Sequence, residues 1–341
     1  MQSKRKFYLD NLRTLTILLL FPYHTFMIYN NSDSWYVHGQ DIAVTSFFID
    51  VGGTWMMPLL FAVAGIATSY ALRKRSIGQY AKERFNKLLI PFVFGVILLV
   101  PVQSYIAGLY FSGTANYLDF FTTLTDLTGY DGAFTPGQLW FLLYLFLISI
   151  ISIPVIALHK SRQKAHYVAK GIPLVVLILF GVIPVFTHEI LNVGGKSLGE
   201  YFTYFLFGYL ILSKEEILEK LDQYRFLLLG IMIAGLLEAI LTDHLFQEFF
   251  SWINILAILG LGRHYLNFNN KATSYLTKSS FGIYLFHQSW IVIVAYFILP
   301  ITDISGIQII LILASSIVLT FLTYEGAKRV KIFRWMFGLK N

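Results

Sequence analysis

The sequence predicts an all-α, polytopic integral membrane protein with about ten transmembrane helices and both termini in the cytoplasm. Two observations lead to this fold class: the composition of the chain and the distribution of its basic residues. Of the 341 residues, 56% are hydrophobic and only 13% are charged, and the mean hydropathy is +0.64. A soluble globular chain carries roughly 25% charged residues. The chain therefore has too few charges to cover the surface of a soluble enzyme, and its apolar content also excludes disorder.

Ten apolar segments are long enough, or nearly long enough, to cross a membrane. A helix needs about 17–25 mostly apolar residues to span roughly 30 Å of hydrocarbon. The candidate segments are residues 10–30, 45–72, 84–111, 137–157, 171–187, 197–212, 224–242, 246–266, 279–300 and 304–327. The apolar run of the first segment is longer than that of a signal peptide, and no small-residue cleavage site follows it, so we expect it to be retained. We expect one transmembrane domain over residues 1–341, without an appended soluble domain.

The basic residues alternate with these segments in a way that predicts their orientation. Cytoplasmic connections of membrane proteins collect Lys and Arg. All of the 26 Lys and Arg residues except Arg13 and Lys196 lie at the two termini or in every second connection. The intervening connections carry acidic residues instead. This alternation fits an even number of spans with both termini inside, and it accounts for the net charge of +7 without a nucleic-acid partner.

The sequence lacks the residues that several kinds of enzyme and metal site require. The chain has no cysteine, which excludes disulfides, a thiolate nucleophile and a zinc or iron–sulfur site built on cysteine. The sequence also contains no nucleophile elbow, phosphate-binding P-loop, zinc-protease motif or EF-hand loop. We therefore expect no metal in this protein.

Ionisable groups inside the predicted spans are functional candidates, because they are costly to place in a membrane. The best placed are His24 in the first span and His287 in the ninth. Arg13 precedes His24 by eleven residues, which at about 100° per residue puts both on one helical face, roughly 16 Å apart. A neutral imidazole suits a general base near pH 7, and the arginine fork suits a phosphorylated donor. Alternatively, Arg13 pairs with Asp10, and His24 is a packed, hydrogen-bonded histidine.

Further candidates lie in the third, fourth and ninth spans. Tyr284 and His287 are three residues apart and share a helical face, although they could equally serve as hydrogen-bonding contacts between helices. Arg84 and Lys87 open the third span, also three apart, and could clamp phosphates at the cytoplasmic mouth or simply anchor the helix. Trp140 opens the fourth span, where tryptophan is usually an interfacial anchor.

A set of short motifs follows one another along these spans. They are Tyr8-Leu-Asp-Asn-Leu-Arg13 with ten residues between Arg13 and His24, Met57-Pro-Leu-Leu-Phe-Ala-Val-Ala-Gly65, Arg84-Phe-Asn-Lys87-Leu-Leu-Ile-Pro91, Leu139-Trp140-Phe141-Leu, Phe281-Gly-Ile-Tyr-Leu-Phe-His287-Gln288, and Tyr324-Glu325 before a basic, aromatic tail. With these motifs the chain resembles the membrane acyltransferase type 3 family, in its branch of short proteins similar to bacterial glucan-modifying, succinyl-transferring enzymes. The matches run from residue 7 to about residue 335.

The resemblance implies an integral-membrane O-acyltransferase of the bacterial plasma membrane. Such an enzyme moves an acyl group, of the acetyl or succinyl class, from cytosolic acyl-CoA to a hydroxyl of an extracytoplasmic glycan or other cell-envelope acceptor. By position, the resemblance makes His24 the catalytic base and Arg13 its functional partner. The residues that would contact the donor or line its site are Arg84, Lys87, Trp140, Tyr284 and His287. Lys87 stands where many relatives would carry a second arginine, which changes the geometry of the clamp.

Two alternatives belong to other functional classes. A secondary transporter or exporter of a small polar or lipid-linked molecule would also have about ten spans with buried His and Arg. The absence of a visible internal repeat in the sequence argues against a transporter built from duplicated halves. A non-enzymatic sensor is a weaker alternative, because no sequence feature points to it directly.

Overall fold

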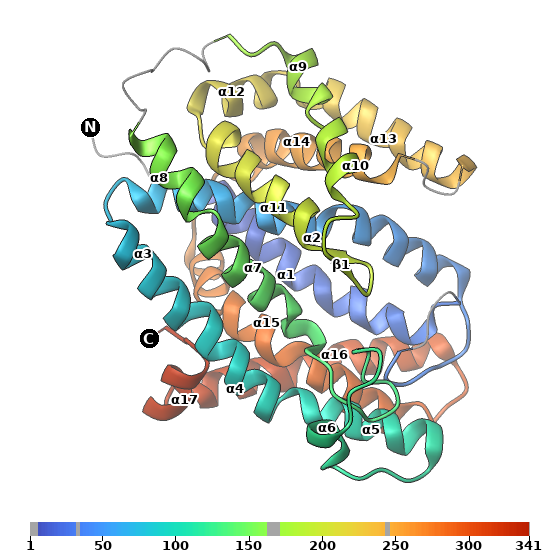
Figure 1. Ribbon diagram of the computed structural model, residues 1–341. Coiled ribbons are helices and arrows are strands. Elements are labelled where there is room, and N and C mark those ends of the chain that lie inside the picture. Colours follow the sequence, from blue (N-terminus) through green and yellow to red (C-terminus); the bar gives the residue numbers. More distant parts are fainter. Residues whose placement is uncertain (1–5, 32–34, 162–170, 243–245, 341) are drawn as a thin grey trace. The chain divides into compact units, whose positions relative to one another are not determined.

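The computed structural model of the protein describes residues 6–31, 35–161, 171–242 and 246–340, and it consists mainly of helices (Figure 1). Within these ranges, the strands form a single antiparallel hairpin of β1 (Asn192–Val193) and β2 (Lys196–Ser197). The all-α prediction is confirmed. Five of the basic residues on which the predicted topology rests lie outside the described ranges: Lys4, Arg5, Arg162, Lys164 and Lys170.

The chain divides into two compact units that are interleaved in sequence. The first unit comprises Met1–Arg13, Val51–Arg84 and Tyr144–Thr273, and the second comprises Thr14–Asp50, Phe85–Leu143 and Ser274–Asn341. Several boundaries fall inside continuous helices, such as α1 (Phe7–Phe26) and α2 (Ala43–Leu72). The single domain over residues 1–341 stays a prediction.

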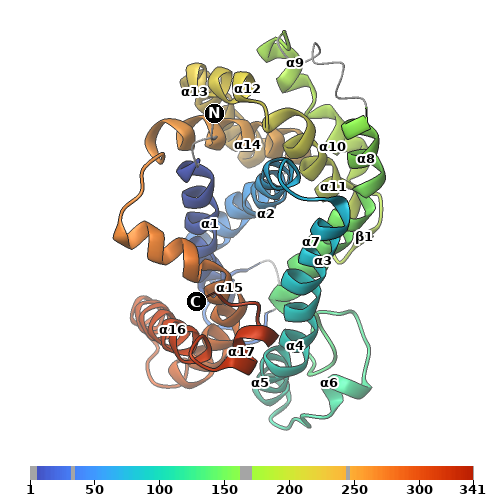
Figure 2. The ribbon, with the colours of Figure 1, turned by 90° about the vertical axis from the view of Figure 1, so that its left-hand side faces the viewer.

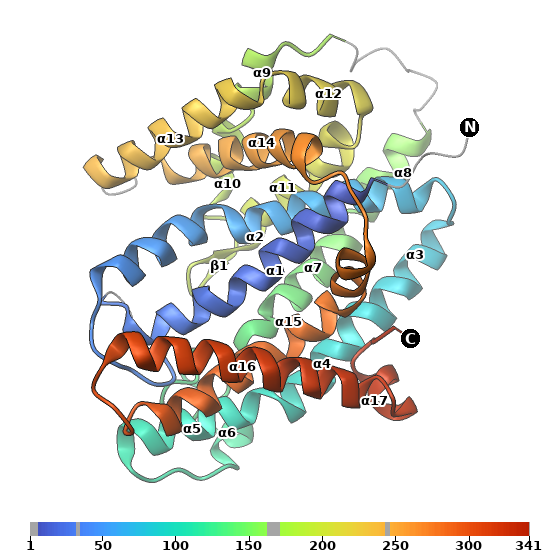
Figure 3. The ribbon, with the colours of Figure 1, turned by 180° about the vertical axis from the view of Figure 1, so that it is seen from behind.

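The first unit contains parts of α1, α2, α7 (Trp140–Ile151) and α15 (Lys271–Ile298) together with a series of shorter helices. These are α3 (Ile77–Arg84), α8 (Ile153–Ser161), α9 (Leu174–Leu179), α10 (Val182–Thr187), α11 (Leu198–Phe207), the π-helix η4 (Gly208–Leu212), α12 (Glu215–Gln223), α13 (Arg225–Thr242) and α14 (Gln247–Tyr265). The α12 and α13 helices both pack against α14 (Figure 1, Figure 3).

Two glycines allow helices of the first unit to approach each other closely. A Cβ atom added to Gly65 on α2 would lie 2.0 Å from the backbone oxygen of Phe205 on α11. One added to Gly208 would lie 2.1 Å from the backbone oxygen of Ala62 on α2. The backbones of α2 and the α11–η4 segment therefore touch because neither glycine has a side chain, as is common between membrane helices.

The second unit contains the remaining parts of α1, α2, α7 and α15. Its other elements are the 3-10 helix η1 (Met27–Tyr29), the π-helix η2 (Phe85–Leu89), α4 (Ile90–Leu98), α5 (Val100–Ser112), α6 (Asp119–Thr122), the 3-10 helix η3 (Gly137–Leu139), α16 (Ser305–Ala327) and α17 (Lys331–Met336). The short α17 lies beside α4 (Figure 2).

Among the four single helical stretches of the described residues that are long and apolar enough to cross a membrane, α15 is the most buried, and it packs against α16 in the second unit. A Cβ atom added to Gly282 on α15 would lie 2.4 Å from the ring of Tyr324 on α16. Further along the pair, Trp290 Nε1 donates a hydrogen bond to Thr323 Oγ1 at 2.8 Å. These contacts fix the rotation of α15 about its axis, and with it the direction in which its polar residues point.

The described residues contain membrane-spanning candidates, but fewer than ten. Four helical stretches are long and apolar enough to cross a membrane: Ala43–Leu72, Ile77–Ser112, Lys271–Ile298 and Ser305–Ala327. Two bent pairs raise this number to six if each is one span: Gly137–Ile151 with Ile153–Lys160, and Glu215–Gln223 with Arg225–Leu241. The other predicted spans fall on α1, on α9 and α10, on α11 and on α14. Ten spans and cytoplasmic termini therefore stay predictions.

Candidate active site

The second unit brings His24 of α1 together with His287 of α15. Their ring centroids are 5.2 Å apart, and the two planes are inclined by 41°. Trp35, which follows η1, stacks on the His24 ring with centroids 5.9 Å apart and planes inclined by only 9°. The edge of Phe21 packs against His287 at 5.7 Å. Two residues that the sequence singled out in different spans are therefore neighbours inside one aromatic cluster.

The ring nitrogens of these histidines differ in their hydrogen bonding. Nδ1 of His287 lies 2.8 Å from the backbone oxygen of Tyr284. In the described part of the chain, Nε2 of His287 and Nδ1 of His24 are buried and have no hydrogen-bond partner. A buried polar atom without a partner costs about 1–3 kcal/mol, and such atoms call for a functional explanation. The pair therefore has unused hydrogen-bonding capacity that a substrate could satisfy.

Tyr284 lies on the same face of α15 as His287, as the sequence predicts. The two ring centroids are 6.1 Å apart, and Tyr284 also packs edge-on against Phe141 of α7 at 5.9 Å. Its hydroxyl donates a hydrogen bond to the backbone oxygen of Gln138 in η3. Because this hydroxyl is already engaged, the contact serves to hold α15 against η3.

A buried amide network that was not predicted from the sequence lies next to this cluster. Gln103 Nε2 of α5 donates hydrogen bonds to Gln138 Oε1 at 3.0 Å and to Ser289 Oγ at 2.8 Å. Gln288 Nε2 donates to Gln103 Oε1 at 2.9 Å, and Gln138 Nε2 donates to the backbone oxygen of Leu285 at 2.9 Å. The network ties α5 and η3 to α15 around His287. Its sequence signal was available, since Gln103 interrupts an apolar span and polar residues there are functional candidates.

Trp140 and Lys87 belong to the second unit as well. Trp140 is the first residue of α7, directly after η3, and its partly buried ring meets Phe141 edge-on at 6.4 Å. Lys87 lies within the π-helix η2. The prediction that Arg84 and Lys87 share one helical face assumes α-helical spacing, which does not apply in a π-helical turn. Such turns occur frequently at functional sites.

Arg13 and Arg84 belong to the first unit. Arg13 Nη2 lies 3.4 Å from Asp10 Oδ1, with 41% of the arginine side chain exposed, so the ion pair considered as an alternative for Arg13 is present. Arg84 Nη2 donates to Thr68 Oγ1 at 3.3 Å, and its guanidinium lies over the ring of Tyr80, 4.8 Å from the centroid. Within the described residues, Arg84 Nε is buried without a hydrogen-bond partner. The guanidinium is held in place while part of its donor capacity stays unused.

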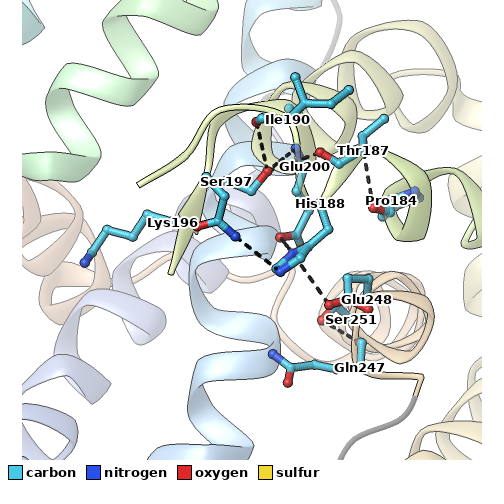
Figure 4. Close-up of polar contacts among 12 residues, drawn as sticks. Pro184, Thr187, His188, Ile190, Lys196, Ser197, Glu200, Gln247, Glu248 and Ser251 are labelled. Carbon is cyan, nitrogen blue, oxygen red and sulfur yellow. Dashed lines mark hydrogen bonds and ion pairs between the residues drawn. The ribbon is translucent and has the colours of Figure 1, made fainter. Parts of the chain in front are cut away.

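A second polar cluster of the first unit joins the end of α10, the hairpin and the first turns of α11 and α14 (Figure 4). His188 Nδ1 lies 2.9 Å from Glu200 Oε2 and 3.5 Å from Glu248 Oε1. Ser197 caps α11 by accepting a hydrogen bond from the Glu200 backbone N–H. Burial lowers the pKa of His188, but the hydrogen bond and charge of Glu200 outweigh this effect and raise the pKa overall.

Within the described ranges, no group of three or more His, Cys, Asp or Glu side chains is arranged to hold a metal ion. His188, Glu200 and Glu248 join three chain segments, and we call this cluster the His188 clasp. Nothing in the sequence indicates this cluster, because its three titratable residues come from segments that meet only in the folded chain.

Comparison with known proteins places the chain in a family. The model of the acyltransferase 3 family, described as an acyltransferase domain, matches residues 6–325. The chain is 22% identical to "Glucans biosynthesis protein C" of Salmonella heidelberg over 374 residues, covering 99% of this chain and 96% of the relative. The protein of the same name from Salmonella schwarzengrund is 22% identical over 376 residues, with the same coverage. No solved structure matches this chain. The chain belongs to the acyltransferase 3 family, and it is a membrane acyltransferase that transfers groups other than aminoacyl groups.

Proposed function

We propose that the protein is an integral-membrane O-acyltransferase that moves an acyl group from cytosolic acyl-CoA to a hydroxyl of an extracytoplasmic acceptor, with His24 as the general base. The observation that carries the proposal is the buried Nδ1 of His24, which has no hydrogen-bond partner in the described residues and lies on a ring beside His287. A base of this kind needs one ring nitrogen, here Nε2, with its lone pair free for the hydroxyl proton, and a neighbour such as His287 that can hold the proton on Nδ1.

The transfer requires one base and no further reagent. The lone pair of the His24 imidazole accepts the proton of the acceptor hydroxyl, and the oxygen forms a bond to the carbonyl carbon of the thioester. The carbon–sulfur bond then breaks, and the proton passes from the imidazolium to the departing CoA thiolate. The products are an acyl ester and free CoA, and the imidazole returns to its neutral form. Acyl-CoA is the co-substrate, and no metal takes part.

The donor would be held by basic side chains near the cytoplasmic ends of the spans. Arginine binds phosphate through two parallel hydrogen bonds, and the guanidinium of Arg84 is fixed by Thr68 and Tyr80 with Nε still uncommitted. Lys87 would add a second positive charge. Arg13, on the same helix as His24, would act as its functional partner. Trp140, Tyr284 and His287 would line the path of the acyl group.

Two further observations support the acceptor and the membrane location in this proposal. The relatives carry the name glucans biosynthesis protein C, which favours a glucan or related envelope polysaccharide as the acceptor. The acyl group would be of the acetyl or succinyl class. The alternation of basic residues supports ten spans with both termini in the cytoplasm of a bacterial cell, and therefore a multi-pass protein of its plasma membrane. Membership of an acyltransferase family disfavours the transporter alternative.

The proposal is tested by incubating the detergent-purified protein with acetyl-CoA, succinyl-CoA or free CoA and measuring both saturable binding and the release of free thiol. We expect one thioester to bind saturably and to be cleaved slowly in water, with faster release when a soluble glucan is added. Failure of every thioester to bind or to be cleaved would contradict the proposal, and transport of lipid-linked or polar solutes would then be the next activity to measure.

A further inference from the structure

The two uncommitted nitrogens of the histidine pair are chemically complementary. A backbone oxygen can only accept a hydrogen bond, so the 2.8 Å contact between His287 Nδ1 and the Tyr284 oxygen requires a proton on Nδ1. In a neutral imidazole, Nε2 of His287 then carries a lone pair and can only accept. The neighbouring uncommitted atom is Nδ1 of His24, which donates whenever the His24 proton is on that nitrogen.

We propose that His287 is a positioning residue whose Nε2 accepts a hydrogen bond from Nδ1–H of His24 and thereby leaves Nε2 of His24 as the base. The inference rests on the proposed function and assigns the tautomer of its base. It runs as a chain of hydrogen bonds: the Tyr284 oxygen accepts from His287 Nδ1–H, and His287 Nε2 accepts from His24 Nδ1–H. The acceptor hydroxyl then donates to His24 Nε2.

The separation of the two rings is compatible with this hydrogen bond. The ring centroids are 5.2 Å apart and the planes are inclined by 41°, a separation at which rotation of the His24 ring about its last side-chain torsion can turn Nδ1 toward Nε2 of His287. That torsion is broad for an imidazole. Trp35 covers one face of the His24 ring, and the edge of Tyr23 packs against it at 5.3 Å. These contacts hold the His24 ring beside His287 and restrict how far it can turn.

The arrangement provides what a base needs beyond its own lone pair. When His24 takes the hydroxyl proton it becomes an imidazolium with protons on both nitrogens, and the hydrogen bond from Nδ1 to His287 Nε2 stabilises that charge. The wrong tautomer, with the proton on Nε2, would present no lone pair to the acceptor. In serine proteases, loss of the group that selects the tautomer lowers kcat by about 10⁴-fold. A neutral imidazole partner is weaker than a carboxylate, so we expect a smaller effect here.

Two substitutions separate positioning from a general structural role. Asn at position 287 keeps an N–H for the Tyr284 oxygen but is too short to reach His24, whereas Gln reaches further and offers an oxygen as acceptor. We expect His287→Asn to fold and to bind acyl-CoA normally while kcat falls about 100-fold at unchanged KM for the donor. We expect His287→Gln to recover most of that kcat, to within about tenfold of the wild type. His264→Gln, at an exposed histidine of the first unit, is the matched control.

Each other outcome overturns the inference. Equal inactivity of His287→Gln and His287→Asn with intact donor binding would mean that His287 must itself carry a proton. A raised donor KM in both variants would place His287 against the thioester instead. Full activity of His287→Asn would remove it from the reaction. Measuring His24→Gln in parallel distinguishes failure of this inference from failure of the proposed function. An active His24→Gln would refute the proposed function itself, whatever the variants at position 287 do.

Discussion

Trp35 lies flat against the imidazole of His24, with the two planes inclined by 9° and only 3% of the tryptophan exposed. The tryptophan lies in the connection after α1 and η1, so a loop residue packs against the His24 side chain of α1. Stacking on one face leaves only the edge of the imidazole, where both nitrogens lie, available for hydrogen bonding. Trp35 thus orients the candidate base without contributing a polar group.

Removal of the Trp35 ring should slow the reaction rather than weaken donor binding. We expect Trp35→Ala to lower kcat by about tenfold or more, because misplacing a catalytic group by about 1 Å can cost 100-fold. Trp35→Phe should retain most of the activity, since a flat ring still covers His24. Steady-state CoA release measures both, and Trp335→Ala on the exposed face of α17 serves as the control. An active Trp35→Ala would show that the stacking has no role in orienting His24.

The guanidinium of Arg84 is the strongest candidate for donor binding. A hydrogen bond to a charged group contributes about 1.5–3 kcal/mol, so Arg84→Ala should weaken acyl-CoA binding by about 10-fold to 100-fold with a small change in kcat. Binding of acetyl-CoA and succinyl-CoA by titration tests this. Arg73→Ala, at another arginine held over a tyrosine ring in the same connection, should bind as the wild type does. Equal affinities for Arg84→Ala and wild type would leave Arg84 as a topological anchor.

The amide network around Gln103 should affect stability as well as activity. Gln103→Leu removes a donor to Gln138 and Ser289 and the acceptor for Gln288. Each buried partner left without a hydrogen bond costs about 1–3 kcal/mol, so the variant should unfold at a clearly lower temperature in detergent. Gln223→Leu, at an exposed position of α12, should change the unfolding temperature little. If Gln103→Leu unfolds at the wild-type temperature, the hydrogen bonds of the network do not contribute to stability.

The His188 clasp should make the stability of the first unit depend on pH. A histidine whose pKa is raised by folding stabilises the protein fully below its ordinary pKa of about 6.5, and that stabilisation is lost as the pH rises through the raised value. The pKa of His188 is raised by Glu200 despite burial. The destabilisation caused by His188→Gln should therefore be largest near pH 6 and shrink toward pH 9, as measured by thermal unfolding.

The carboxylate partner provides the control for this pH effect. In a Glu200→Gln background, which removes the nearest charge, His188→Gln should have a smaller effect with a weaker dependence on pH, because the two residues contact each other. A pH-independent difference between wild type and His188→Gln would show that the charge of the imidazole contributes nothing to the clasp.

The sequence predicted the long helices and singled out the two histidines because both have strong local signals. The bounds of the predicted spans 45–72 and 304–327 agree with those of α2 and α16 to within two residues. A long apolar run bounded by polar connections defines both ends of a helix. His24 and His287 stand out as ionisable groups in apolar segments. Their contact follows from helix packing, which no single segment encodes.

Other features depend on contacts that sequence periodicity does not reveal. The fifth predicted span is divided between α9 and α10 at Gly181, next to the rings of Phe249 and Trp252. The π-helical turn that contains Lys87 has no signature in the hydrophobic pattern. Trp35 lies in a connection, and nothing in the sequence indicates that it stacks on His24. Gln103 is recognisable in the sequence as a polar residue inside a span, but an uncharged amide there does not indicate which residues it bonds.

The central claim is that His24 acts as the base of an acyl-CoA-dependent transfer. The most direct measurement compares wild type, His24→Ala and His264→Ala, each purified in detergent, for acyl-CoA binding and for CoA release with a soluble glucan as acceptor. We predict that all three bind the same thioester with similar affinity, and that only His24→Ala loses CoA release, by 100-fold or more as expected for a general base. Release by His24→Ala at the wild-type rate, with protein amount and membrane insertion intact, would contradict the account.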